Sequence, residues 1–112
     1  MNLIMLAGRL GKDPEIKYFE NGKVLAQVSI GITRYQGKDK EKTTDWFDLK
    51  AWGKTAELIA EKYRKGDVLC VQGNVEQEKW ESEGQKRSKL VVKVDQVIFL
   101  PGVGSKPAEE DF

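Results

Sequence analysis

The chain has 112 residues, enough for one domain with a modest core. Its 19 basic and 18 acidic residues leave a formal net charge of +1, so net charge alone does not indicate a polyanionic partner. Histidine is absent and cysteine occurs once, which excludes His-dependent triads, an internal disulfide and a cysteine-cluster metal site, and we expect neither metal nor cofactor.

The N-terminal segment predicts a β-strand rather than a targeting signal. Residues 2–10 form an apolar run that ends in glycine and charge, and a turn is expected at residues 11–15. No basic stretch precedes this run, and no other run approaches the length of a membrane span. We therefore expect a cytoplasmic protein without a membrane partner.

The next segments predict a hairpin turn and two further strands. Asn21-Gly22 stands between β-prone residues and is typical of a hairpin turn. Residues 24–33 alternate strictly between apolar and polar side chains, and residues 45–52 alternate again after a lysine-rich segment, 34–44, that predicts a loop. These are the second and third strands of the sequence.

The second half of the chain predicts one helix and two more strands. Residues 54–66 carry apolar side chains at helical spacing and end in a glycine: Ala56, Ile59, Ala60 and Tyr63. Residues 68–80 alternate as a strand, and Gly73 in their middle predicts a bulge or bend. A second polar loop is expected at residues 81–88, and a last strand follows it.

The order of these elements favours an all-β fold. Five strands with one short helix between strands 3 and 4 fit a five-stranded Greek-key OB-fold barrel, a fold that binds oligonucleotides or oligosaccharides on one strand face and two loops. We expect residues 1–100 to form this domain. Residues 101–112 predict a short acidic C-terminal tail without periodicity.

Aromatic side chains are predicted on the polar face of the strands. Trp46 and Trp52 alternate with Phe47, Leu49 and Ala51, so they share a face with Asp48 and Lys50. Trp80 ends the fourth strand on the outward face, and Tyr35 follows the second strand in the same phase. Basic residues stand close to these rings in the sequence: Arg34, Lys50, Lys54, Lys79 and Arg87.

Outward aromatics beside cations suit a single-stranded nucleic acid. Unpaired bases offer flat faces for stacking, worth about 1–3 kcal/mol per base, and the phosphates require cations within reach. Duplex bases are already stacked, and an oligosaccharide would not need so many cations. A subunit interface remains an alternative reading of the tryptophans. A small hydrolase or nuclease is a further alternative, against which stand the lack of histidine and of clustered acids.

Several motifs resemble those of the bacterial single-stranded DNA-binding protein (SSB) family, in the family's order and over almost the whole chain. They are N-x-x-x-x-x-G-R-L-G-x-D-P-E at residues 2–15, N-G-x-x-x-A at 21–26, D-W-F-D-L-K-A-W-G-K-T-A-E at 45–57, Y-R-K-G at 63–66, V-Q-G at 71–73 and E-K-W at 78–80. The W-F-D-L variant resembles the cyanobacterial branch.

The resemblance implies a non-enzymatic protein that coats single-stranded DNA in replication, recombination and repair, with little sequence preference. It implies a homotetramer built as a dimer of dimers. It also assigns base stacking to Trp46, Trp52 and Trp80, with Tyr35 beside a further stacking position. The basic positions of the binding path correspond to Lys54, Arg64, Lys65 and Lys79.

The sequence departs from the family pattern at three places, one of which is the loop after Trp80, which is about a residue short and has Ser88 where an aromatic residue is common. Asp48 stands where the family often has arginine, which removes one expected phosphate contact. The tail is short, although its acidic tip still predicts docking of replication and repair proteins through Glu109, Glu110, Asp111 and Phe112. A dimeric primosome-type accessory protein is the alternative within this fold.

Overall fold

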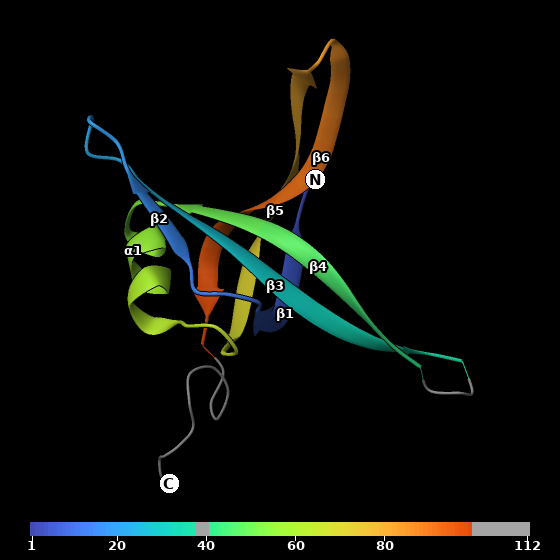
Figure 1. The fold of residues 1–112 in the computed structure, drawn as a ribbon. Helices are drawn as coiled ribbons and strands as arrows, with labels where there is room; N and C mark the ends of the chain where they lie inside the picture. Colours follow the sequence, from blue (N-terminus) through green and yellow to red (C-terminus); the bar gives the residue numbers. More distant parts are fainter. Residues whose placement is uncertain (38–40, 100–112) are drawn as a thin grey trace, which may run out of the picture.

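The computed structural model describes residues 1–37 and 41–99, and within them six strands and one helix form (Figure 1). The strands are β1 (Ile4–Leu10), β2 (Glu15–Tyr18), β3 (Val24–Gln36), β4 (Glu41–Trp52), β5 (Val68–Ser82) and β6 (Gln85–Ile98). The helix α1 (Gly53–Lys62) lies between β4 and β5 in the chain. It covers one side of the strands in Figure 1.

Five of the strands close into a barrel. Their order around the ring is β1, β5, β6, β4 and β3, and β3 returns to β1 where Leu10 pairs with Ile30. β4 and β6 run parallel where Leu49 pairs with Val92, and the other neighbours are antiparallel. The predicted five-stranded OB-fold barrel, with its helix between the third and fourth strands of the ring, is confirmed.

The turn predicted at Asn21-Gly22 is present and adds a sixth strand outside the ring. The Phe19 N–H donates to the Lys23 carbonyl at 2.9 Å, and Gly22 adopts a φ of 88°, which favours glycine. β2 precedes this turn and pairs with β3 at the edge of the sheet. Its four residues are too few for a periodic signal, so the strand count from sequence was one short.

Two segments predicted as polar loops instead form hairpin arms. β3 and β4 stay paired as far as Gln36 and Glu41, and β5 and β6 as far as Ser82 and Gln85. We call residues 33–37 with 41–44 the β3–β4 arm, and residues 76–90 the β5–β6 arm. Both extend away from the barrel (Figure 1). Both arms are polar in composition because solvent reaches both faces of each two-stranded segment, while the backbone groups still pair between the strands.

The barrel interior is filled by the inward positions of the alternating strands. The largest fully buried side chains are Ile30, Leu49, Ile59, Leu69 and Val71. Each contributes about 1.5–3 kcal/mol of hydrophobic stabilisation. α1 adds Ala56 and Ile59 to this core, and Tyr63, which follows the last helical turn, is only 4% exposed.

The predicted irregularity at Gly73 is confirmed. The pairing of β5 with β6 shifts between Gln72 and Gly73, so that Asp95 is an extra residue on β6. A methyl group at Gly73 would overlap the backbone carbonyl of Lys93. Glycine therefore allows the two strands to approach at the point where the sheet bends toward closure.

The described residues contain no helix long and apolar enough to cross a membrane. The boundary predicted at residue 100 and the tail residues Glu109, Glu110, Asp111 and Phe112 lie outside the described residues.

Candidate nucleic-acid interface

All three tryptophans lie on the outer surface of the barrel and its arms. Trp46 is 57% exposed, Trp52 40% and Trp80 44%. Strand alternation places Trp46 and Trp52 there, because Leu49 and Ala51 of the same strand, β4, point inward and are buried. The outward orientation predicted for all three side chains is confirmed, and each borders its own hollow in the surface.

Trp46 lies over a backbone surface made by glycines. It pairs across the sheet with Gly31, and a methyl group at Gly31 or Gly11 would stand 2.9 or 2.7 Å from its ring. The same ring borders a hollow of about 630 Å³ whose rim includes Arg9 and Lys65. The predicted cation Lys65 is thus brought to the predicted stacking residue Trp46, although they are 19 residues apart in the chain.

Trp52 is supported by an aromatic side chain that the sequence analysis did not assign to the site. The ring centroids of Trp52 and Phe19 are 5.8 Å apart and their planes are inclined by 31°. Trp52 also pairs across the sheet with Leu25. Leu25 is buried, although strand alternation places its side chain on the outer face of β3. The sequence shows Phe19 two residues before the Asn21-Gly22 turn, but it does not show the strand register that brings Phe19 to Trp52.

Two lysines that the sequence analysis did not assign to the site also border Trp52. Lys23 and Lys93 line a hollow of about 440 Å³ beside the ring. The predicted cation Lys54 is exposed in the first turn of α1, two residues after Trp52. Lys23 and Lys93 were missed because neither stands near a tryptophan in the sequence.

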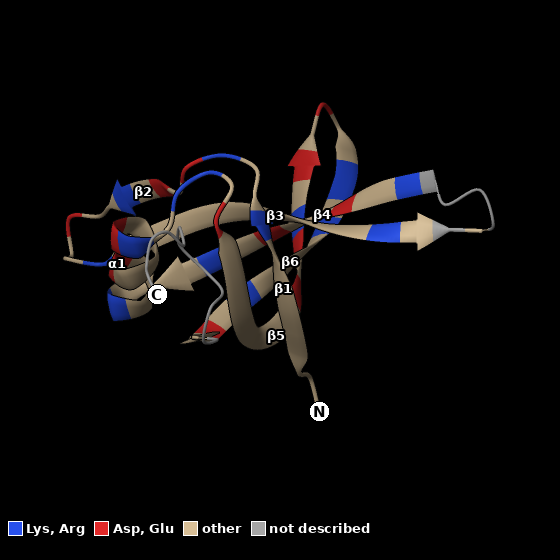
Figure 2. Cartoon of the chain, turned by 90° about the horizontal axis from the view of Figure 1, so that it is seen from below, with Lys and Arg blue, Asp and Glu red and all other residues tan. Residues whose placement is uncertain are grey.

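Trp80 lies on the β5–β6 arm among the cations predicted for it. It pairs across the arm with Arg87, and the two residues line a hollow of about 410 Å³ with Lys79 and Lys86. The arm therefore presents one large ring and several positive charges on a narrow ribbon. In Figure 2, Lys and Arg lie along both hairpin arms, with Asp and Glu among them.

Tyr35 stands on the β3–β4 arm, away from these hollows. It is 65% exposed, and the Nζ atom of its cross-strand neighbour Lys42 lies 5.9 Å from the ring centroid. The next residue toward the barrel, Arg34, donates from Nε to Asp45 Oδ2 at 2.7 Å. The arm thus offers an aromatic ring with a cation over it, while the Arg34 guanidinium is already engaged.

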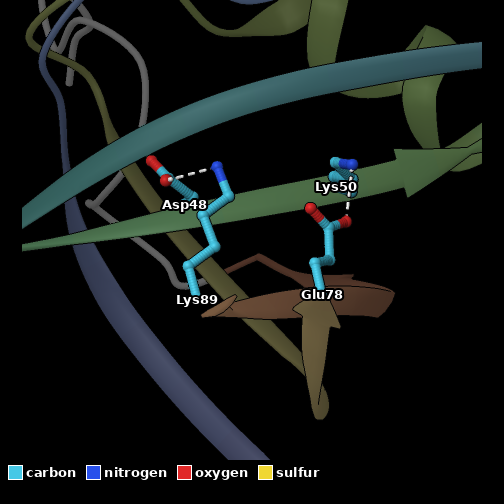
Figure 3. A network of polar contacts seen from close by, with 4 residues as sticks. All are labelled: Asp48, Lys50, Glu78 and Lys89. Carbon is cyan, nitrogen blue, oxygen red and sulfur yellow. Dashed lines mark hydrogen bonds and ion pairs between the residues drawn. The ribbon is translucent and has the colours of Figure 1, made fainter. Parts of the chain in front are cut away.

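Other basic residues of this surface also have partners within the protein. Lys50 Nζ donates to Glu78 Oε2 at 2.6 Å, and Lys89 Nζ lies 3.4 Å from Asp48 Oδ2 (Figure 3). Arg64 Nη1 donates to the carbonyls of Ala60 and Tyr63, at the C-terminal end of α1. These contacts join residues far apart in the chain or at a helix end, and residue spacing did not predict them.

Within residues 1–37 and 41–99, no group of three His, Cys, Asp or Glu side chains is arranged to hold a metal ion. Cys70 is partly buried, because it alternates along β5 with the buried Leu69 and Val71. Burial raises the pKa of Tyr63 above its ordinary value, and the charges of Asp67 and Cys70 add to the effect.

Comparison with known proteins agrees with this geometry. Residues 1–100 match the model of the single-strand binding protein family. Single-stranded DNA-binding protein 1 of Synechocystis is 42% identical over 108 residues, covering 95% of this chain and 86% of the relative. Single-stranded DNA-binding protein 1 of Nostoc is 40% identical with the same coverage. The expected likeness to the cyanobacterial branch is therefore confirmed.

A solved structure shares the fold. The Plasmodium falciparum SSB complex with ssDNA superposes with a TM-score of 0.76 and is 29% identical, covering 84% of this chain and 86% of the other. The family model accounts for nearly the whole chain, and the two cyanobacterial relatives are 42% and 40% identical to it. This chain belongs to the single-strand binding protein family.

Proposed function

We propose that this protein binds single-stranded DNA with little sequence preference and coats it during replication, recombination and repair. One observation carries the proposal: three tryptophans, 40–57% exposed, lie on the outer surface with lysine or arginine beside each. Stacking of bases on such rings tolerates any sequence, because every base has a flat face. Family membership and the DNA-bound structural relative support the same ligand.

The residues divide into stacking and phosphate-contacting groups. Trp46, Trp52 and Trp80 stack bases, and Tyr35 extends the path along the β3–β4 arm. Phosphate contacts come from the basic residues near these rings: Arg34, Lys50, Lys54, Arg64, Lys65, Lys79 and Arg87. Lys65, Lys79 and Arg87 support this division best, because each lines the hollow of a tryptophan.

The protein acts as a homotetramer, a dimer of dimers, which multiplies the length of DNA in contact. The family resemblance supports this assembly. Exposed apolar side chains at the N-terminal end, Leu3 at 66% and Met5 at 60%, offer surface that a second subunit would cover. Light scattering on the purified protein should give four times the chain mass, and a mass of two chains would favour the accessory-protein alternative.

Residues 1–100 form the DNA-binding domain, and the tail 101–112 docks replication and repair proteins through Glu109, Glu110, Asp111 and Phe112. Acidic residues beside an aromatic ring suit a basic pocket on a partner. We place the protein in the bacterial cytoplasm, associated with the nucleoid. Removing residues 109–112 should abolish partner binding and leave the affinity for oligo(dT) intact.

An equilibrium titration with oligo(dT), followed by intrinsic tryptophan fluorescence, tests the function. Strong quenching that weakens as salt increases is expected, because both stacking and phosphate contacts contribute. An unchanged signal with no mobility shift would refute the proposal. Cleavage of labelled single strands in magnesium or manganese would instead favour the nuclease alternative.

A further inference from the structure

A polar pocket on the outer surface contains three lysines that the sequence analysis did not bring together. Its volume is about 230 Å³, several times the roughly 30 Å³ that one liquid water occupies. β3 contributes Gln27 and Ser29 to its lining, and the three lysines are Lys12, Lys50 and Lys89. Positive charge and hydrogen-bonding side chains are what a phosphate group requires.

Each of these lysines is paired with a carboxylate of the same chain. Lys12 Nζ lies 3.1 Å from Glu15 Oε2, three residues along the chain. The other two pairs cross between strands: Lys50 to Glu78 at 2.6 Å and Lys89 to Asp48 at 3.4 Å. The pocket therefore has the cations of a phosphate site, with carboxylates in the positions that phosphates would take.

The two cross-strand pairs form an alternating square of charges (Figure 3). Asp48 and Lys50 are two residues apart on β4, so their side chains leave the same face. Glu78 and Lys89 are direct cross-strand neighbours on the β5–β6 arm. Each acid contacts one base across the strands, and the two ion pairs tie the arm that carries Trp80 to the strand that carries Trp46 and Trp52.

We propose that this pocket is a phosphate subsite of the DNA path, and that Asp48 and Glu78 compete with DNA for its lysines. This inference rests on the proposed function. When a strand binds, Lys50 and Lys89 exchange their carboxylate partners for phosphate oxygens. The carboxylates act as built-in phosphate mimics that hold the lysines in place and lower the affinity for DNA.

The exposure of the pairs makes such an exchange accessible. The side chains of Lys89 and Asp48 are 46% and 53% exposed, and their contact is long, so water screens it. Lys50 and Glu78 are 28% and 34% exposed and in closer contact, so this pair gives way second. After each exchange a carboxylate is left near a phosphate, which offsets part of the gain and reduces the salt dependence.

The test uses Asp48→Asn, Glu78→Gln and the double variant, titrated with oligo(dT) over a series of salt concentrations. Each single variant should bind about two- to five-fold more tightly, the factor that corresponds to one exposed ion pair. The double variant should show a salt slope steeper by up to about 0.7 for each released lysine. Thermal melting of each variant establishes that it is folded.

Glu61→Gln is the matched control, because it removes one negative charge from the exposed surface of α1. Its affinity should stay close to that of the wild type. In a Lys89→Gln background, Asp48→Asn should give a smaller gain, since the lysine that it releases is absent and only the repulsion between the carboxylate and the DNA is removed. The comparison in the Lys89→Gln background tests the Asp48–Lys89 ion pair even if the loss of one negative charge by itself changes the affinity.

Unchanged or weaker binding by Asp48→Asn and Glu78→Gln would overturn the exchange, as would an equal gain in Glu61→Gln. A gain of the same size in the Lys89→Gln background would overturn the assignment of Asp48 to Lys89. If the wild-type protein itself failed to bind oligo(dT), the proposed function would fall with the inference. Wild-type binding without any gain in the variants rejects the inference alone.

Discussion

The ring of Trp46 packs on the backbone of Gly11, where a methyl group would come within 2.7 Å of ring atom Cζ3. The contact joins the turn after β1 to the outer face of β4. It sets the six-membered ring of the indole against the protein, while the side chain stays 57% exposed. The ring proposed to stack a base therefore already has a contact within the protein that limits its movement.

Gly11→Ala should therefore displace the Trp46 ring. We expect a loss of about 1–3 kcal/mol in the free energy of unfolding, the usual cost of overpacking, together with weaker binding of oligo(dT). Urea denaturation measures the first and a fluorescence titration the second. In a Trp46→Ala background the substitution should cost little, because the atoms that it meets are those of the ring. Equal costs in both backgrounds would contradict this reading.

Phe19→Ala should weaken DNA binding without touching a tryptophan. The contact between Phe19 and Trp52 is an aromatic pair, which contributes about 0.5–1.5 kcal/mol, and its loss leaves Trp52 less well oriented. The neighbouring Tyr18→Ala is the control, since Tyr18 is 77% exposed. Isothermal titration with oligo(dT) should show a loss for the first variant only, and equal losses would count against a supporting role for Phe19.

Arg87→Gln should make DNA binding less sensitive to salt. Arg87 pairs with Trp80 across the β5–β6 arm, and the proposed function assigns it a phosphate contact beside the base on Trp80. Loss of one phosphate contact on a single strand lowers the slope of log affinity against log salt by about 0.7. Titrations at a series of salt concentrations measure the slope. Lys17→Gln on β2 is the control, and a slope unchanged in Arg87→Gln would exclude the contact.

Gly73→Ala should destabilise the barrel more than Gly11→Ala does. The added methyl group meets the backbone carbonyl of Lys93, which cannot rotate away as a side chain would. We expect a loss near the upper end of about 1–3 kcal/mol in the free energy of unfolding. Urea denaturation gives the value, and a loss below that of Gly11→Ala would show that the strands can separate at the bulge.

Tyr63 should make stability depend on pH in alkaline solution. Burial raises its pKa in the folded state above the unfolded value of about 10, so the protonated phenol favours folding. This contribution is complete below about pH 10 and is lost as pH rises through the folded pKa. The difference in unfolding free energy between wild type and Tyr63→Phe should therefore change above about pH 10. A difference that stays constant across this alkaline range would contradict the raised pKa.

Alternation along the strands was the part of the fold most readable from sequence. It placed Trp46 and Trp52 outward and Leu49 inward, because strand side chains alternate whatever the tertiary fold. It did not find the arms, since ribbons wet on both faces have the polar composition of loops. Gly73 was identified as an irregular position because glycine inside a strand marks close backbone approach.

The site was only half readable from sequence. Cations adjacent to tryptophans, such as Lys79, were found by proximity in the chain. Phe19 beside Trp52 and Glu78 beside Lys50 depend on how distant strands align, which no local pattern encodes. The ion pair between Lys50 and Glu78 is the most important contact that the sequence did not reveal. Lys50 was expected to contact DNA, and it must first leave Glu78 to do so.

Base stacking on the outward tryptophans is the central claim, and single-tryptophan variants test it most directly. In each variant two of Trp46, Trp52 and Trp80 become Phe, which keeps an aromatic face for binding and leaves one fluorophore. Saturating oligo(dT) should strongly quench the fluorescence of all three variants, because a stacked base contacts each remaining indole. Tight binding that leaves all three emissions unchanged would contradict base stacking on these rings.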